Sequence, residues 1–296
     1  MIAQSLTDHI QQQLSDYLGR DIIIQSSNAV GGGCINQSYL VSSTTGERWF
    51  VKTNQAHLLP MFEAEYVGLQ ALKSSNSFII PMPLFSGQLS ETAYLVLEYL
   101  DLSGSCNDKD FAGRLAKLHL TTHDRFGFSG DNFIGASPQY NDWHNNWFEF
   151  FMQQRLERQL KMMVDKGTGS ELERIWPELL QACRSLFSDH RPLPSLLHGD
   201  LWMGNVSGTP GGCSIYDPAC YYGDFEADLA MLELFGHLSS QFYQHYYQDI
   251  KKVPGSGLRK TWYNLYHIMN HANLFGGSYY HQARQMCQQL INHSQG

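Results

Sequence analysis

The sequence His-Gly-Asp-Leu-Trp-Met-Gly-Asn at residues 198–205, followed by Ile-Tyr-Asp-Pro at residues 215–218, decides the fold that we expect for this chain. Phosphoryl transfer to a hydroxyl group needs a carboxylate that orients the nucleophile and accepts its proton. It also needs an amide oxygen and a second carboxylate to hold Mg²⁺ against the phosphates. Asp200, Asn205 and Asp217 supply these groups in that order. We therefore interpret Asp200 as the catalytic base and Asn205 and Asp217 as metal ligands.

The same order of groups occurs in protein kinases, as a catalytic loop followed by a metal-binding Asp-Phe-Gly. Here Gly199 replaces the arginine of that loop, and Asp-Pro-Ala at residues 217–219 replaces Asp-Phe-Gly. An isolated His-Gly-Asp would more often be only a turn. The full octet and the downstream aspartate favour the catalytic interpretation.

A lysine and a glutamate upstream complete the expected catalytic set. Lys52 ends an apolar strand and can reach the α- and β-phosphates of ATP if a helix carboxylate steadies it. Glu63 and Glu65 compete for that role in a helix predicted over residues 60–73, where a two-residue offset points them to different sides. Glu65 shares the apolar face that should meet the sheet, so we select Glu65.

Two further segments are predicted to bind ATP through their backbone. A glycine-rich turn between two strands allows N–H groups to approach phosphate oxygens, although such a turn is often only a flexible hairpin. It comprises Gly31, Gly32, Gly33 and Cys34. Adenine should meet the exit of a buried strand at 94–97, where two lobes join. That exit comprises Glu98, Tyr99, Leu100 and Asp101.

The order of the predicted elements indicates two lobes. A helix is predicted over residues 5–18. Short strands follow, with apolar segments at 22–24, 39–41, 49–52 and 94–97. From residue 111 onward the pattern is almost wholly helical, except near 190–222. We expect an α+β, protein-kinase-like fold, with a small antiparallel β-rich lobe at 1–100 and a larger, mainly helical catalytic lobe at 101–296.

Composition excludes several classes of protein. The formal net charge is −8 and no block of Lys or Arg occurs, which argues against nucleic-acid binding. No apolar run approaches the roughly 20 residues of a membrane span, and no signal-peptide layout begins the chain. We therefore expect a cytoplasmic protein. The six cysteines are scattered without a Cys-x-x-Cys pair, so we expect reduced thiols rather than zinc ligands or disulfides.

Other polar residues have a structural or a functional interpretation. Asp224 and Glu226, together with Asp217, form an acidic cluster that we expect to favour a cationic substrate near the pocket. Asp228 is most simply a carboxylate in the first turn of a helix, although it could also brace the catalytic loop. The pairs His119/His123 and His267/His271 lack a third metal ligand, and we interpret them as structural histidines.

Several motifs together resemble one known family. They are Gly-Gly-Cys-Ile-Asn at 32–36, Phe-Val-Lys at 50–52, the octet at 198–205, Tyr-Asp-Pro-Ala at 216–219 and Leu-Phe-Gly-Gly at 274–277. The chain is similar, over nearly its whole length, to the fructosamine kinase (ketosamine 3-kinase) family, which is related to aminoglycoside and choline kinases. The octet, with Leu-Trp before Gly-Asn, is the most specific of these motifs.

The resemblance implies phosphorylation of the 3-hydroxyl of ketosamines by ATP and Mg²⁺. The substrates would be fructosamine or ribulosamine adducts of small amines or protein lysines, and the unstable product would release the amine as a deglycation repair. By the same resemblance Asp200 is the base, Asn205 and Asp217 bind Mg²⁺, and Lys52 and Glu65 clamp ATP. Trp202 would pack against the sugar, and Cys34 would be responsive to redox. We expect a monomer or homodimer.

Three alternatives remain open from the residues. A choline or aminoglycoside kinase shares the skeleton of the octet but would not predict Trp202 together with Asp-Pro-Ala at 217–219. A protein kinase would need a long activation loop, and only a short segment separates Asp217 from the helix of Asp228. A pseudokinase acting as a binding module would have lost at least one of the catalytic groups, and all of them are present.

Overall fold

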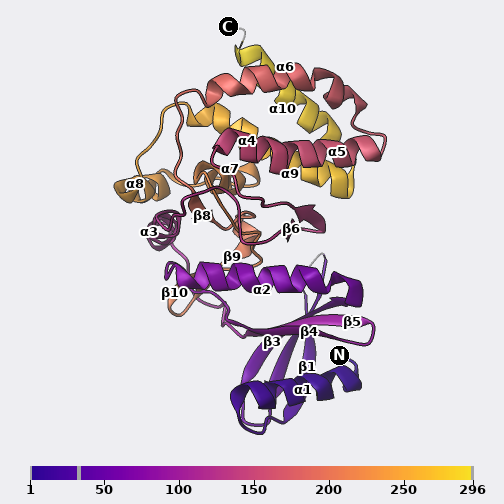
Figure 1. Ribbon diagram of the computed structural model, residues 1–296. Helices are drawn as coiled ribbons and strands as arrows, with labels where there is room; N and C mark the ends of the chain where they lie inside the picture. Colours follow the sequence, from indigo (N-terminus) through magenta and orange to yellow (C-terminus); the bar gives the residue numbers. More distant parts are fainter. Residues whose placement is uncertain (1, 32–34, 295–296) are drawn as a thin grey trace.

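The small lobe is an antiparallel sheet with a helix on each face. The computed structural model describes residues 2–31 and 35–294. The five strands occur in the order β1-β2-β3-β5-β4 (Figure 1). They are β1 (Ile24–Val30), β2 (Gln37–Ser43), β3 (Arg48–Gln55), β4 (Pro83–Leu89) and β5 (Thr92–Glu98). The two helices are α1 (Gln4–Leu18) and α2 (Leu59–Ser74).

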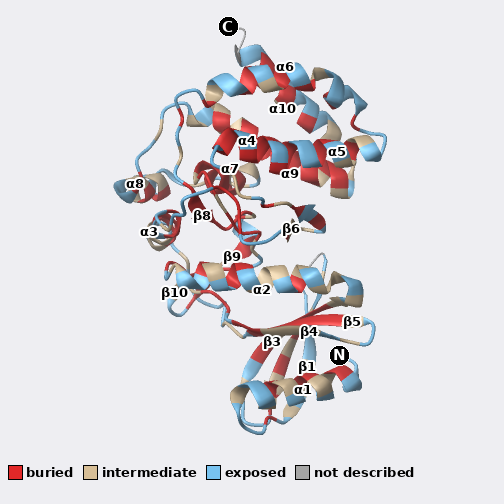
Figure 2. Cartoon of the chain, viewed as in Figure 1, coloured by how far each residue is buried: buried red, intermediate tan, exposed pale blue. Residues whose placement is uncertain are grey.

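Strand β5 explains why both faces of the sheet are covered. Successive side chains of a strand point to opposite faces, and the run from Ala93 to Leu97 is buried throughout. Tyr94 and Val96 belong to the core under α1, whereas Ala93, Leu95 and Leu97 belong to the core under α2. Helix α2 therefore lies between the sheet and the large lobe, and Figure 2 shows its buried residues in that position.

The large lobe is mainly helical. Its helices are α3 (Asp108–His119), α4 (Trp147–Phe151), α5 (Glu157–Asp165), α6 (Ser170–Leu186), α7 (Glu226–Leu234), α8 (Ser240–Asp249), α9 (Ser256–Phe275) and α10 (Tyr279–Ser294), with a π-helical segment η2 (Met152–Leu156) between α4 and α5. Three short hairpins or strand pairs interrupt them. They are formed by β6 (Asn132–Ile134) with β7 (Ser137–Gln139), β8 (Ser195–Leu197) with β11 (Tyr221–Gly223), and β9 (Val206–Thr209) with β10 (Gly212–Ile215).

This architecture confirms the predicted α+β fold, with two local differences. The first strand begins only at Ile24, because Ile22 packs under α1 while Ile23 is 59% exposed. The sequence pattern predicted helix from residue 111 onward, but the segment between α3 and α4 is not helical. It holds the β6–β7 hairpin, and glycines with left-handed backbone at Gly127 and Gly135 break any helix there. None of the described helices is long and apolar enough to cross a membrane.

The expectation that all cysteines are reduced is wrong for one pair. Cys106, which precedes α3, and Cys213, in β10, form a disulfide across 107 residues of sequence. The same segments meet through the backbone, where Gly104 N–H donates to the Gly208 carbonyl at 3.1 Å. The pairing depends on this contact, which the spacing of the cysteines along the chain does not reveal. Cys183, Cys220 and Cys287 are buried free thiols.

Candidate active site

Lys52 lies at the centre of an ion-pair network that joins the lobes. Its Nζ lies 2.6 Å from Glu65 Oε1, and it also contacts Asp217 of the large lobe. Glu63 is exposed and points elsewhere, as the helical face predicted. Burial by itself would lower the pKa of Lys52, but the attraction of Asp217 and Glu65 outweighs burial and raises it. The lysine therefore remains a cation in this buried position.

Strand β8 leads directly into the loop of residues 198–205, and Asp228 binds the first two residues of that loop. The backbone N–H groups of His198 and Gly199 donate to the two carboxylate oxygens of Asp228 at 2.8 and 2.9 Å. His119 lies 3.3 Å from the same carboxylate. Burial would raise the pKa of Asp228, but these hydrogen bonds and the nearby histidines keep it below its ordinary value. Asp228 lies in the first turn of α7, as the first interpretation had it, and it also braces the loop, as the second had it.

Asp200 and Asn205 face one another across the turn of this loop. The side-chain N–H₂ of Asn205 donates to the Asp200 backbone carbonyl at 2.9 Å, which directs the amide oxygen of Asn205 away from that carbonyl. Burial, with repulsion from Asp217 and Asp228, raises the pKa of Asp200 to about 7. A carboxylate with such a pKa is poised to take up a proton near neutral pH.

Asp217 occupies a strained turn that the structure fixes from several sides. Its φ is 58°, in the left-handed region that few non-glycine residues adopt, and its side chain is 51% exposed. Ala219 N–H donates to the His198 carbonyl at 2.8 Å. A Cβ at Gly199, whose φ is +82°, would overlap the Ala219 carbonyl, so only glycine allows the two segments to approach.

Two buried amides that the sequence did not single out also hold this turn. Asn132 donates to the Cys220 carbonyl at 2.7 Å, and Gln139 donates to the Ala219 carbonyl at 3.0 Å and to Asn132 at 2.7 Å. The two residues are paired across the β6–β7 hairpin. Polar residues at both ends of a Phe-Ile-Gly-Ala-Ser-Pro run are the only signal in the sequence, and such a signal is common in exposed hairpins.

The segments predicted to bind ATP flank the sheet as expected, though only some of their residues can be placed. Gly31 follows β1, while Gly32, Gly33 and Cys34 lie outside the described residues. Asn54 of β3 holds the end of this turn through Asn36, at 2.7 Å. In the second segment, Glu98 N–H donates to the Met82 carbonyl at 2.8 Å.

The other side chains of that second segment have local contacts. The Tyr99 ring lies under Arg48, whose guanidinium carbon is 4.1 Å from the ring centroid. Leu100 is half-buried, and Asp101 accepts a hydrogen bond from Ser103 N–H at 3.0 Å. The expected contact of residues 98–101 with adenine remains a prediction.

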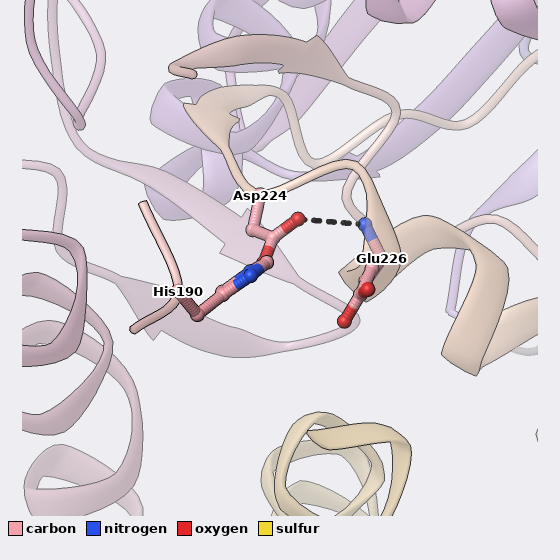
Figure 3. A group of neighbouring side chains, drawn as sticks. All are labelled: His190, Asp224 and Glu226. Carbon is pink, nitrogen blue, oxygen red and sulfur yellow. Dashed lines mark hydrogen bonds and ion pairs between the residues drawn. The ribbon is translucent and has the colours of Figure 1, made fainter. Parts of the chain in front are cut away.

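The expected role of Asp224 and Glu226 in attracting a cationic substrate is contradicted by their burial. Asp224 is 0% exposed, contacts His190 and accepts a hydrogen bond from Tyr263 at 2.6 Å. Glu226 forms a two-bond ion pair with Arg259, at 2.7 and 2.9 Å. His190, Asp224 and Glu226 form a compact buried group (Figure 3). These buried partners occupy the two carboxylates, so the carboxylates present no exposed charge to a substrate.

Both histidine pairs have structural contacts, in agreement with their interpretation. His119 lies between Tyr246, at 2.7 Å, and Asp228. His123 stacks on Trp143 with ring centroids 4.4 Å apart. His267 is buried, which lowers its pKa to about 3, and its backbone carbonyl accepts from His271. A histidine held neutral in this way is a packing residue.

One protein family accounts for almost the whole length of this chain. The fructosamine kinase family model matches residues 6–293. The chain belongs to the fructosamine kinase family. This assignment agrees with the resemblance found in the motifs. It covers the small lobe, the catalytic loop and the helices behind it.

Relatives of this fructosamine kinase family member match over most of their length. A probable ketoamine kinase of Synechocystis is 43% identical, over 95% of this chain and 96% of its own. The ketosamine-3-kinase of Mus musculus is 35% identical, over 86% of this chain and 92% of its own. The crystal structure of a putative fructosamine-3-kinase from Haemophilus somnus has a TM-score of 0.85 at 29% identity, covering 95% of this chain and 96% of its own.

The fold also extends to more distant proteins. An ADP-bound aminoglycoside phosphotransferase has a TM-score of 0.64 at 14% identity, covering 99% of this chain and 97% of its own. At such low identity the likeness shows the fold alone. It places the fructosamine kinase chain among protein-kinase-like two-lobed folds, as the catalytic octet predicted.

Proposed function

We propose that this chain is an ATP-dependent kinase that phosphorylates the 3-hydroxyl of ketosamines, with Mg²⁺ as its metal. The observation that carries the proposal is the contact of Lys52 with both Glu65 and Asp217, directly beside the Asp200 loop, in a member of the fructosamine kinase family. Lys52, Glu65, Asp200, Asn205 and Asp217 are the residue types that phosphoryl transfer requires, which supports the proposal. This completeness argues against a pseudokinase.

The chemistry assigns a role to each side chain. Lys52, steadied by Glu65, binds the α- and β-phosphates of ATP. The Asp200 carboxylate orients the acceptor hydroxyl and takes its proton as the oxygen attacks the γ-phosphorus. The bond from that phosphorus to the bridging oxygen breaks, and ADP leaves. Trp202 packs against the sugar ring, and the backbone at 98–101 together with the glycine-rich turn at 31–34 holds the nucleotide.

The residues present fit a hard divalent cation. Asp217 offers a half-exposed carboxylate, and Asn205 an amide oxygen directed away from the Asp200 carbonyl. Carboxylate and amide oxygens are the ligands that Mg²⁺ prefers. Such an ion neutralises negative charge on the phosphate oxygens when bound. Asp217 would exchange its contact with Lys52 for the metal when nucleotide enters.

The biological consequence follows from the product. A ketosamine 3-phosphate is unstable and releases its amine, so we propose a deglycation repair activity in the cytoplasm, on free ketosamines or glycated lysines.

We also propose residue 100, just after β5, as the boundary between the lobes. Acceptor specificity and location are both testable with the purified enzyme and with cells.

The deciding experiment measures ADP release with ATP and Mg²⁺ against ribuloselysine, fructoselysine, choline and kanamycin. We expect turnover of a ketosamine and loss of about 10²–10⁴-fold in kcat for Asp200→Asn, with ATP affinity little changed. Turnover of only choline or kanamycin would support a kinase activity but would refute ketosamines as its substrates. Equal kcat in the variant would overturn the role of Asp200.

A further inference from the structure

Exposed tryptophan and phenylalanine side chains lie on segments that meet beside the loop of residues 198–205. The chain has 6 tryptophans and 16 phenylalanines, and within residues 2–31 and 35–294 only Trp202, Phe235 and Phe275 among them are exposed, at 41%, 49% and 65%. Single exposed apolar residues are ordinary, but a contiguous group of large ones marks a binding surface. These three residues therefore indicate a binding surface only if they lie close to one another.

Short contacts bring together the segments that carry these three residues. Met203, which follows Trp202 and is 51% exposed, has its Cγ 3.9 Å from the position that a Cβ would take on Gly236. The neighbouring Phe235 has its ring centroid 5.3 Å from that of His271. His271 in turn lies 5.6 Å from Phe275, one helical turn further along α9. The surface thus runs from the catalytic loop to the end of α9.

The same surface continues to the small lobe. A Cβ on Gly135, in the turn of the β6–β7 hairpin, would lie 3.2 Å from Leu274 Cδ1 and 3.6 Å from Ile35 Cδ1. Ile35 belongs to the turn after β1 and is 43% exposed. We call Ile35, Trp202, Met203, Phe235 and Phe275 the apolar rim. It begins beside the glycine-rich turn and ends two residues after Asp200, so it borders the proposed site of phosphoryl transfer.

The chemistry of the acceptor indicates what the rim contacts. In a ketosamine the amine is attached to carbon 1, close to the hydroxyl on carbon 3. With that hydroxyl at Asp200, we expect the group carried by the nitrogen to extend past the neighbouring exposed residues of the same loop, Trp202 and Met203. Burial of Asp224 and Glu226 removes the acidic alternative for contacting this group. The surface it meets is apolar and aromatic.

We propose that the apolar rim binds the amine-derived part of the ketosamine, and that the enzyme selects acceptors in which this part is apolar or aromatic. This inference rests on the proposed function. Its occupant is the amine substituent, such as the methylene chain of a glycated lysine and an aromatic residue beside it in a peptide. Burial of apolar area against Phe235 and Phe275 supplies the selectivity.

A series of acceptors that share one sugar tests the proposal. The ribulosamines of glycinamide, hexylamine and phenylalaninamide differ only in the amine substituent. We expect kcat/KM to be about 10-fold higher for the two apolar acceptors than for the glycinamide adduct. In Phe275→Ala and Phe235→Ala that ratio should fall several-fold toward one, and Phe275→Leu should restore part of it.

The matched control is Leu193→Ala, since Leu193 is 69% exposed in the loop before β8 and lies outside the rim. Its ratio should equal that of the wild type. An unchanged ratio in both phenylalanine variants would overturn the proposal, as would an equal loss on all three acceptors. Dissociation of a dimer by Phe275→Ala, seen by analytical ultracentrifugation, would show that a second copy covers the rim instead. Absence of turnover of every ribulosamine by the wild type would refute the proposed function itself.

Discussion

Lys52 Nζ lies 2.6 Å from Glu65 Oε1, and the same ammonium group contacts Asp217 in the other lobe. One buried cation thus links strand β3, helix α2 and the turn after β10. An unpaired charge at this position would be costly, so the two carboxylates determine where the ammonium group lies. We therefore expect the position of the lysine, and with it the affinity for nucleotide, to depend on Glu65.

Glu65→Gln should therefore weaken ATP binding, whereas Glu63→Gln should not. The two residues lie on the same helix two positions apart, and Glu63 is exposed. Loss of one partner of a charge pair that is fully desolvated raises the KM for ATP by about 10-fold or more. Steady-state kinetics at saturating acceptor measures this change. The same KM in both variants would mean that Glu65 does not position Lys52.

The pH dependence of kcat/KM should report Asp200. Its pKa is raised to about 7 by burial and by the charges of Asp217 and Asp228. The base acts only when deprotonated, so kcat/KM should fall about tenfold per pH unit below that value and level off above it. A profile that is flat from pH 5.5 to 8 would show that no group with this pKa limits the reaction.

Asp228→Asn should shift the same acidic limb to lower pH. The substitution preserves shape but removes one of the charges that raise the pKa of Asp200. It also replaces one of the two carboxylate oxygens by an NH₂ group, so either the His198 or the Gly199 N–H loses its acceptor, which should lower the free energy of unfolding by about 1–3 kcal/mol. Asp124→Asn, at a side chain that is 78% exposed, should change neither the pH profile nor urea denaturation.

The Cys106–Cys213 disulfide should contribute to stability when the protein is oxidised. It closes a loop across 107 residues, and links of this kind stabilise by about 2–4 kcal/mol, chiefly through the unfolded chain. Urea denaturation with and without a dithiol reductant should show this difference for the wild type and none for Cys106→Ser. A reductant effect of equal size in the variant would assign it to another cause.

The sequence predicted best those features that depend on residues close to one another along the chain. The order of Asp200, Asn205 and Asp217 follows from short-range spacing, and the helical period alone selected Glu65 over Glu63. The same reasoning found the helix of residues 5–18, since α1 covers residues 4–18. The assignment of individual roles to these residues, and of ATP to residues 98–101, remains a prediction.

The family, the order of the two lobes and the loop of residues 198–205 could be predicted from the sequence, because each depends on contiguous motifs or on a single period of apolar residues. The contact of Cys106 with Cys213, the burial of Asp224 and Glu226 among His190, Tyr263 and Arg259, and the exposure of Trp202, Phe235 and Phe275 became visible only in the folded chain. These features join residues far apart in the chain. A carboxylate's role depends on whether its partner is solvent, a buried arginine or a substrate, and chain topology sets that partner.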